Sequence, residues 1–79
     1  MFKILYVEDN EDNIYMLSRR LKKKKFDVII ATDGEEGVEK AKSDKPNLIL
    51  MDLSLPKMDG WAATKIIKEN DETKHIPII

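Results

Sequence analysis

The spacing of four short apolar runs constrains the fold of this chain more than any other feature. The runs are Lys3–Val7, Val28–Thr32, Leu48–Met51 and Ile76–Ile79. Each is rich in isoleucine, valine or leucine without strict alternation, which is typical of strands buried on both faces of a parallel sheet. At least 20 residues separate the start of each run from the next, a distance that is too long for hairpins and indicates helical crossovers.

The segments between these runs have the patterns of amphipathic helices. We expect helices at Glu11–Lys24, Glu35–Ser43 and Trp61–Glu69, with Asn10 as the N-cap of the first. The apolar residues expected to face inward are Ile14, Leu17 and Leu21, then Val38 and Ala41, then Ala63, Ile66 and Ile67. Right-handed crossovers then give an α/β fold, an open, doubly wound parallel sheet, in a single domain over residues 1–79.

Composition excludes several classes of function. The 79 residues include no cysteine and one histidine, so they offer no disulfide, thiolate nucleophile or multi-histidine metal centre. With 14 basic and 15 acidic side chains the formal net charge is −1, and we expect neither nucleic acid nor a membrane as a partner. Because the N-terminus lacks a signal-peptide pattern and no run approaches the ~20 apolar residues of a membrane span, we expect a cytoplasmic protein.

Three carboxylates lie where apolar runs end. Glu8 and Asp9 follow the first run directly, and Asp52 follows the third. If the first and third strands are neighbours, these side chains meet at the carboxyl end of the sheet, where open α/β folds bind ligands. Such a cluster of like charges needs a proton or a cation, and a hard divalent ion such as Mg²⁺ suits carboxylate oxygens. Solvated loop acids and helix caps explain the pattern about equally well, and both interpretations stay open at this point.

Three motifs carry a family resemblance. Val7–Glu11 reads VEDNE, Asp33–Gly37 reads DGEEG, and Pro46–Gly60 reads PNLILMDLSLPKMDG. In this order and spacing they resemble the receiver domain of two-component response regulators, and the resemblance runs from Lys3 to the last residue. It implies a flavodoxin-like fold with strand order 2-1-3-4, which places the first and third strands side by side.

The resemblance also implies roles for individual residues. Asp52 matches the phosphoacceptor of receivers, which takes a phosphoryl group from a histidine kinase or a phosphotransfer protein. Asp9 and Asp52 match direct ligands of Mg²⁺, and Glu8 matches an acid that helps through a metal-bound water. The backbone carbonyl of Ser54 matches a further metal ligand, and Gly60 is expected to allow a tight or left-handed turn.

The chain also departs from the family pattern. A receiver has five βα units, and the hydroxyl residue after the fourth strand and the lysine after the fifth have no counterpart among these residues; Thr64 and Thr73 do not match. Receivers catalyse their own phosphotransfer and dephosphorylation without being stand-alone enzymes. We therefore expect a domain truncated before its last βα unit that self-associates through the open edge of the fourth strand and the uncovered face of the first helix. The alternative function is a fragment that does not switch, whose main property is self-association or fragment complementation.

Overall fold

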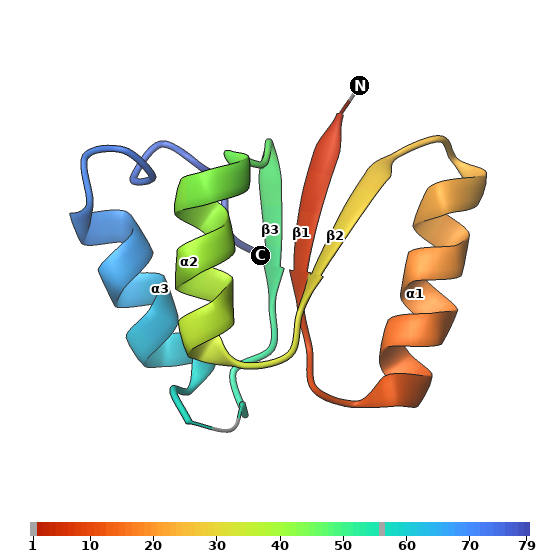
Figure 1. The fold of residues 1–79 in the computed structure, drawn as a ribbon, viewed down its shortest axis with the longest axis horizontal. Helices are drawn as coiled ribbons and strands as arrows, with labels where there is room; N and C mark the ends of the chain where they lie inside the picture. The colour runs from red at the N-terminus through yellow and green to blue at the C-terminus, as the bar shows by residue number, and fades with distance from the viewer. Residues whose placement is uncertain (1, 56) are drawn as a thin grey trace.

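Three strands and three helices alternate along the chain. The computed structural model describes residues 2–55 and 57–79, so Pro56, part of the third motif, lies outside the described residues. The elements are β1 (Lys3–Val7), α1 (Glu11–Lys23), β2 (Asp27–Ala31), α2 (Gly34–Asp44), β3 (Leu48–Met51) and α3 (Gly60–Glu69) (Figure 1). Each of these six elements agrees with its predicted range to within one residue at each end.

The sheet is parallel throughout, with strand order β2-β1-β3. Leu5 of β1 lies opposite Ile29 of β2 on one side and Ile49 of β3 on the other. This order confirms the predicted flavodoxin-like arrangement and makes β1 and β3 neighbours.

The fourth apolar run pairs beside β3, as predicted, but only as a single parallel bridge between Ile49 and Ile78. The N–H of Ile49 donates to the carbonyl of Pro77, and the N–H of Ile79 donates to the carbonyl of Ile49. The prediction of a strand over residues 76–79 was too long, because Ile76 belongs to the preceding turn, where its N–H donates to Thr73, and Pro77 has no N–H.

Each helix begins at a side-chain cap. Asn10, predicted as a cap, accepts a hydrogen bond from the N–H of Asn13 at 3.0 Å. Asp33 and Asp59 cap α2 and α3 in the same way, at 2.8 Å each. These caps satisfy backbone donors that the first turn leaves unpaired, and so they fix where each helix starts relative to the strand before it.

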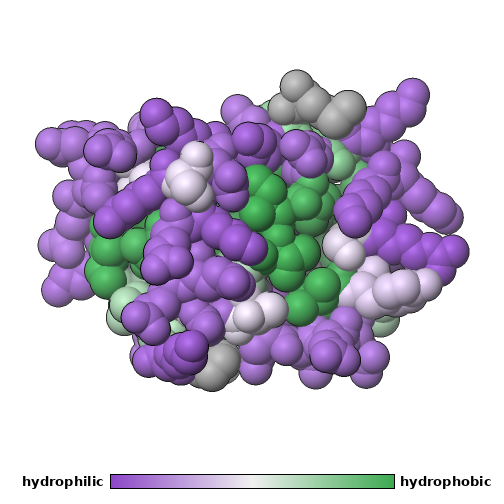
Figure 2. Space-filling model, viewed as in Figure 1, coloured by the Kyte–Doolittle hydropathy of each residue, from purple (hydrophilic) through white to green (hydrophobic). Residues whose placement is uncertain are grey.

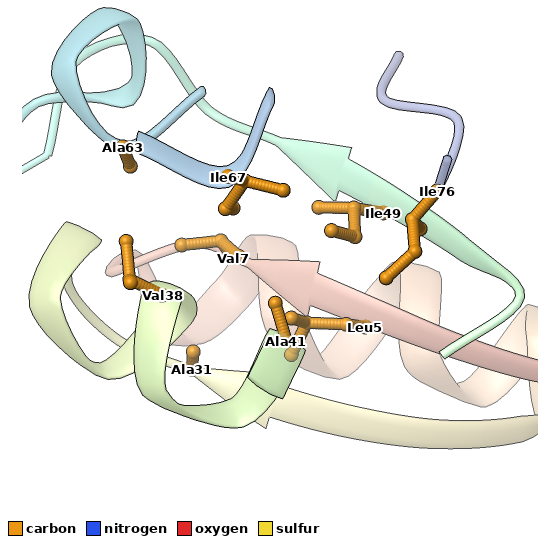
Figure 3. Packing of buried hydrophobic residues seen from close by; sticks show 9 residues of the cluster. All are labelled: Leu5, Val7, Ala31, Val38, Ala41, Ile49, Ala63, Ile67 and Ile76. Carbon is orange, nitrogen blue, oxygen red and sulfur yellow. The ribbon is translucent and has the colours of Figure 1, made fainter. Parts of the chain in front are cut away.

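Helices α2 and α3 cover one face of the sheet (Figure 1). Nine side chains form the core there: Leu5, Val7, Ala31, Val38, Ala41, Ile49, Ala63, Ile67 and Ile76 (Figure 3). The predicted inward positions of α2 and α3 are confirmed except for Ile66, which is 37% exposed. Helix α3 is buried along one narrow stripe of Gly60, Ala63 and Ile67, and Ile66 lies beside that stripe.

Helix α1 lies alone on the opposite face (Figure 1). None of its residues is fully buried, and its apolar stripe of Ile14, Leu17 and Leu21 is half-buried. Strand β2, at the edge of the sheet, is also half-buried over residues 28–30. Figure 2 shows a hydrophobic area between α1 and α2, over the strands. This side of the molecule is therefore packed more loosely than the α2 and α3 side.

Within residues 2–55 and 57–79, no helix is both long and apolar enough to cross a membrane.

Candidate functional site

The carboxyl ends of β1 and β3 bring three acidic side chains together. The N–H of Asp52 donates to the carbonyl of Val7 at 3.0 Å, which continues the β1–β3 ladder and sets Asp52 beside the end of β1. Glu8 and Asp9 follow Val7 directly. One carboxylate oxygen from each of Glu8, Asp9 and Asp52 lies within 4.8 Å of the others. The structure thus places the three predicted carboxylates in one cluster.

The three carboxylates differ in exposure and in how they are held. Glu8 is only 8% exposed, Asp52 is half-buried and Asp9 is exposed. Both oxygens of Glu8 accept hydrogen bonds. Oε1 accepts from the hydroxyl of Tyr6 at 3.3 Å and from Nδ2 of Asn13 at 3.4 Å, and Oε2 accepts from the N–H of Asn10 at 3.2 Å. The buried carboxylate is therefore the one that the chain fixes most firmly.

The sequence analysis missed Tyr6 as a residue of this site. Burial raises the pKa of the Tyr6 hydroxyl above its usual value, and the negative charges of Glu8 and Asp52 and the hydrogen bond to Glu8 raise this pKa further. The two-residue period of a strand could have predicted this role, because it puts the side chains of Tyr6 and Glu8 on the same side of the extended chain.

The loop after β3 is tightly packed around Asp52. The N–H of Ser54 donates to Oδ1 of Asp52 at 3.1 Å, and the N–H of Gly60 donates to the carbonyl of Leu53 at 3.1 Å. A Cβ on Gly60 would collide with the carbonyl oxygen of Asp52 and would lie 2.6 Å from Cα of Leu53. Gly60 is therefore required for close approach of the backbone. The expectation of a left-handed turn at this glycine is wrong, because among the described residues of this loop Lys57 has the positive φ, at 63°.

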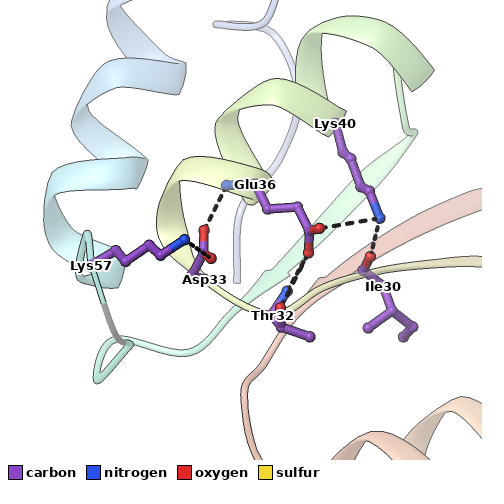
Figure 4. Close-up of polar contacts among 6 residues, drawn as sticks. All are labelled: Ile30, Thr32, Asp33, Glu36, Lys40 and Lys57. Carbon is purple, nitrogen blue, oxygen red and sulfur yellow. Dashed lines mark hydrogen bonds and ion pairs between the residues drawn. The ribbon is translucent and has the colours of Figure 1, made fainter.

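The same loop is attached to the start of α2. Nζ of Lys57 lies 3.7 Å from Oδ2 of Asp33, the cap of α2 (Figure 4). Behind this ion pair, a Cβ on Gly34 would collide with the carbonyl of Met58, so the loop and the helix are in direct backbone contact. The first turn of α2 thus supports the loop that carries Asp52 and Ser54.

Next to this contact, α2 covers the outer edge of β2. Glu36 accepts a hydrogen bond from the N–H of Thr32 at 2.6 Å, and Nζ of Lys40 donates to the carbonyl of Ile30 at 2.6 Å (Figure 4). Nζ of Lys40 and Oε2 of Glu36 are 3.9 Å apart. The carbonyl of Ile30 in β2 and the N–H of Thr32 just after this strand are therefore satisfied by side chains of α2.

Comparison with known proteins identifies the family. A model of the response regulator receiver domain matches residues 4–79, nearly the whole chain. The chain belongs to the response regulator receiver family. Among curated relatives, this receiver is 43% identical over 67 residues to the alkaline phosphatase synthesis transcriptional regulatory protein PhoP of Bacillus subtilis, covering 85% of the chain and 28% of PhoP. It is 37% identical over 76 residues to the polar-differentiation response regulator DivK of Brucella anthropi, covering 96% of the chain and 62% of DivK.

Solved structures agree with this assignment. The receiver domain of a sensor histidine kinase from Pseudomonas aeruginosa superposes with a TM-score of 0.93 at 34% identity, covering 96% of this chain and 62% of that one. That crystal structure is described as having a magnesium ion coordinated in the active site cleft. The present chain spans less than two thirds of the length of these relatives.

Thr64, Thr73 and the single histidine of the chain, His75, lie outside the cluster. Thr73 is buried, and its hydroxyl donates to the carbonyl of Ile67 at 2.7 Å, so it ties the turn after α3 to that helix. Thr64 lies within α3. His75 is an exposed residue of the turn before the Ile78 bridge.

Proposed function

We propose that this receiver accepts a phosphoryl group on Asp52 in a two-component phosphorelay, with Mg²⁺ bound by the acidic cluster. The observation that carries the proposal is the convergence of Glu8, Asp9 and Asp52, with one oxygen of each within 4.8 Å of the others. Membership of the receiver family supports it, as does the magnesium ion described in the active site cleft of the Pseudomonas aeruginosa receiver domain.

The donor set fits a hard divalent cation. All three side chains offer carboxylate oxygens, which Mg²⁺ prefers, and their mutual repulsion favours binding of a positive charge. In the proposal, Asp9 and Asp52 bind the ion directly, the backbone carbonyl of Ser54 provides another oxygen, and Glu8 contributes through a metal-bound water. When bound, the ion offsets the negative charge that would otherwise repel an incoming phosphoryl group.

The chemical step falls to Asp52. One oxygen of its carboxylate attacks the phosphorus of a phosphohistidine, the P–N bond breaks, and the histidine leaves with the electron pair of that bond. The product is an aspartyl phosphate. The hydrogen bond from Ser54 N–H to Oδ1 of Asp52 restrains the carboxylate in this reaction, because it fixes which oxygen faces the loop.

The proposed partners are a histidine kinase or a phosphotransfer protein, and the proposed location is the cytoplasm. The test is incubation with a small phosphoramidate donor and Mg²⁺, followed by intact mass spectrometry. We expect one added phosphoryl group in the original chain, none in Asp52→Asn, and normal uptake in the control Asp71→Asn, whose carboxylate is 92% exposed and away from the cluster. Equal labelling of Asp52→Asn would contradict the proposal.

A second candidate is self-association of the chain, favoured by the loosely packed α1 side. Helix α1 has no fully buried residue, and Tyr15 and Met16 on it are 62% and 55% exposed. The bridge at Ile78 hydrogen-bonds to β3, and Ile79 beside it is 77% exposed. A second copy of the chain would cover these apolar groups. Sedimentation velocity over a hundredfold range of protein concentration tests this, since a constant monomer mass would exclude it.

A further inference from the structure

The hydrogen bonds around the acidic cluster converge on Glu8. In the described chain, Glu8 accepts three hydrogen bonds, from Tyr6, Asn13 and the backbone of Asn10, whereas Asp52 accepts one, from Ser54. Glu8 is also the buried member of the three. A buried carboxylate with both oxygens engaged has little freedom to rotate, so its position relative to Asp9 and Asp52 is set before any cation arrives.

Two parts of the chain provide this restraint. Tyr6 lies in β1 and Glu8 is the first residue after the strand, so the two-residue period of extended backbone puts both side chains on one side, and the Tyr6 hydroxyl donates to Oε1 of Glu8. Asn13 comes from the first turn of α1, which the Asn10 cap holds next to the end of β1. Tyr6 is itself only 8% exposed, so its hydroxyl is held by packing as well as by the hydrogen bond.

We infer that Tyr6 is a positioning residue for the magnesium site: its hydroxyl orients Glu8 and thereby raises the affinity of the cluster for Mg²⁺. The inference rests on the proposed function, because it concerns the same cation. Groups that hydrogen-bond a metal ligand, without touching the metal, fix the ligand's orientation, and their removal weakens metal binding.

A purely structural role makes a different prediction. If the hydroxyl only satisfied a buried carboxylate, its loss would lower the free energy of unfolding and leave the affinity of the folded protein for Mg²⁺ unchanged. If the hydroxyl competed with the cation for Oε1, its loss would strengthen Mg²⁺ binding. Metal affinity, measured well below the unfolding temperature, therefore separates the three cases.

The experiment is a Mg²⁺ titration by isothermal calorimetry at pH 7, on the original chain, Tyr6→Phe and the control Tyr15→Phe. Tyr15 also carries a hydrogen-bonded hydroxyl, to Arg19 at 3.2 Å, but it is 62% exposed on α1. We expect Tyr6→Phe to weaken Mg²⁺ binding by about 10-fold, the lower end of the range for loss of such a hydrogen bond, because Glu8 acts through a metal-bound water in the proposed site. Tyr15→Phe should leave Mg²⁺ binding unchanged.

Two further variants make the test specific to Glu8. Asn13→Ala removes the other side-chain donor to Oε1 from an exposed position, so it provides the same test if Tyr6→Phe does not fold. This variant should also weaken Mg²⁺ binding, by up to about 10-fold. In a Glu8→Ala background, Tyr6→Phe should have no further effect, because the residue through which it acts is gone.

The outcomes distinguish the two proposals. If the original chain binds Mg²⁺ and Tyr6→Phe binds it equally well or more tightly, the inference about Tyr6 is wrong and the proposed function stands. An undiminished effect of Tyr6→Phe in the Glu8→Ala background would also overturn the inference. If the original chain binds no Mg²⁺, the proposed function falls, and the inference falls with it.

Discussion

Replacing Asp52 by asparagine should stabilise the protein when no divalent cation is present. One carboxylate oxygen from each of Asp52, Glu8 and Asp9 lies within 4.8 Å of the others. At that separation two unit charges repel by about 0.9 kcal/mol in water and by about 3.5 kcal/mol at an effective dielectric constant near 20. Asp52 is half-buried and Asp9 is exposed, so the repulsion lies toward the lower value. We therefore expect Asp52→Asn to raise the free energy of unfolding by about 1–2 kcal/mol.

Urea denaturation followed by circular dichroism, at pH 7 and low salt with a chelator, measures this change. Asparagine keeps an Oδ1 that can accept the Ser54 N–H, so the substitution removes charge with little change in shape. The matched control is Asp71→Asn, which makes the same change at a carboxylate that is 92% exposed and should alter stability by no more than about 0.5 kcal/mol. Added Mg²⁺ should stabilise the original chain and the control, but not Asp52→Asn.

Two results would refute this reasoning. If Asp52→Asn is no more stable than Asp71→Asn at low salt, the carboxylates do not repel one another as their separation requires. If the gain is the same in 1 M NaCl, it comes from packing rather than charge, because the screening length there is only about 3 Å. A Mg²⁺ effect equal in all three proteins would mean that the cation binds elsewhere.

Three other substitutions test how the site and its surroundings are built. Gly60→Ala should lower the free energy of unfolding by about 2 kcal/mol or more and weaken Mg²⁺ binding, because the added methyl group collides with the Asp52 carbonyl. Urea denaturation measures the first effect and calorimetry the second. Unchanged values would show that the loop moves to accommodate the methyl group at little cost. Lys40→Met removes the donor to the Ile30 carbonyl at the edge of β2, so this variant should show concentration-dependent association in light scattering. Lys42→Met, at an exposed position of the same helix, should not. Equal behaviour of the two variants would show that Lys40 does not protect this strand edge from association. Tyr6→Phe should lower the free energy of unfolding by about 1–2 kcal/mol near pH 7. Because the folded-state pKa of Tyr6 is raised, this stabilisation is complete below about pH 10 and is lost as the pH rises through the folded-state pKa. The urea midpoints of the original chain and Tyr6→Phe should therefore converge at high pH. A constant difference would contradict the stabilising role of the Tyr6 hydroxyl.

Most of what could be predicted of the fold follows from short sequence patterns, each within one strand, helix or cap. The apolar run at residues 48–51 lies between the polar residues Asn47 and Asp52, and the run at residues 3–7 ends before Glu8; β3 and β1 have those same limits. Asn10 could be predicted as an N-cap because asparagine is among the residues preferred at helix starts and the acidic Glu11 and Asp12 follow it. The convergence of Glu8, Asp9 and Asp52 was predicted from parallel strands whose carboxyl ends meet at one edge, with the family resemblance making β1 and β3 neighbours.

The remaining details depend on contacts between segments that no local pattern specifies. The two-residue period could place Tyr6 and Glu8 on one face of the strand, but a continuous apolar run does not show that this face lies under α1, where Asn13 also donates to Glu8. Ile66 has helical spacing from Ala63 yet is exposed, because α3 packs along a stripe only one residue wide. The role of Gly60 depends on how closely α3 approaches the Asp52 carbonyl, which is a property of the packed fold.

The two halves of the site are supported from opposite faces of the sheet. Asp52 is held by the loop and helix contacts of the closely packed side, through Ser54 and Gly60. Glu8 is held on the loosely packed side, beside a hollow of about 190 Å³ lined by Tyr6, Glu8, Asn13, Met16, Leu17 and Arg20. A change on the α1 side should therefore act first on Glu8 and leave Asp52 in place. Substitutions on the two faces of the sheet should for this reason affect metal affinity and phosphoryl acceptance differently, although the carboxylates of Glu8 and Asp52 lie within a few ångströms of one another.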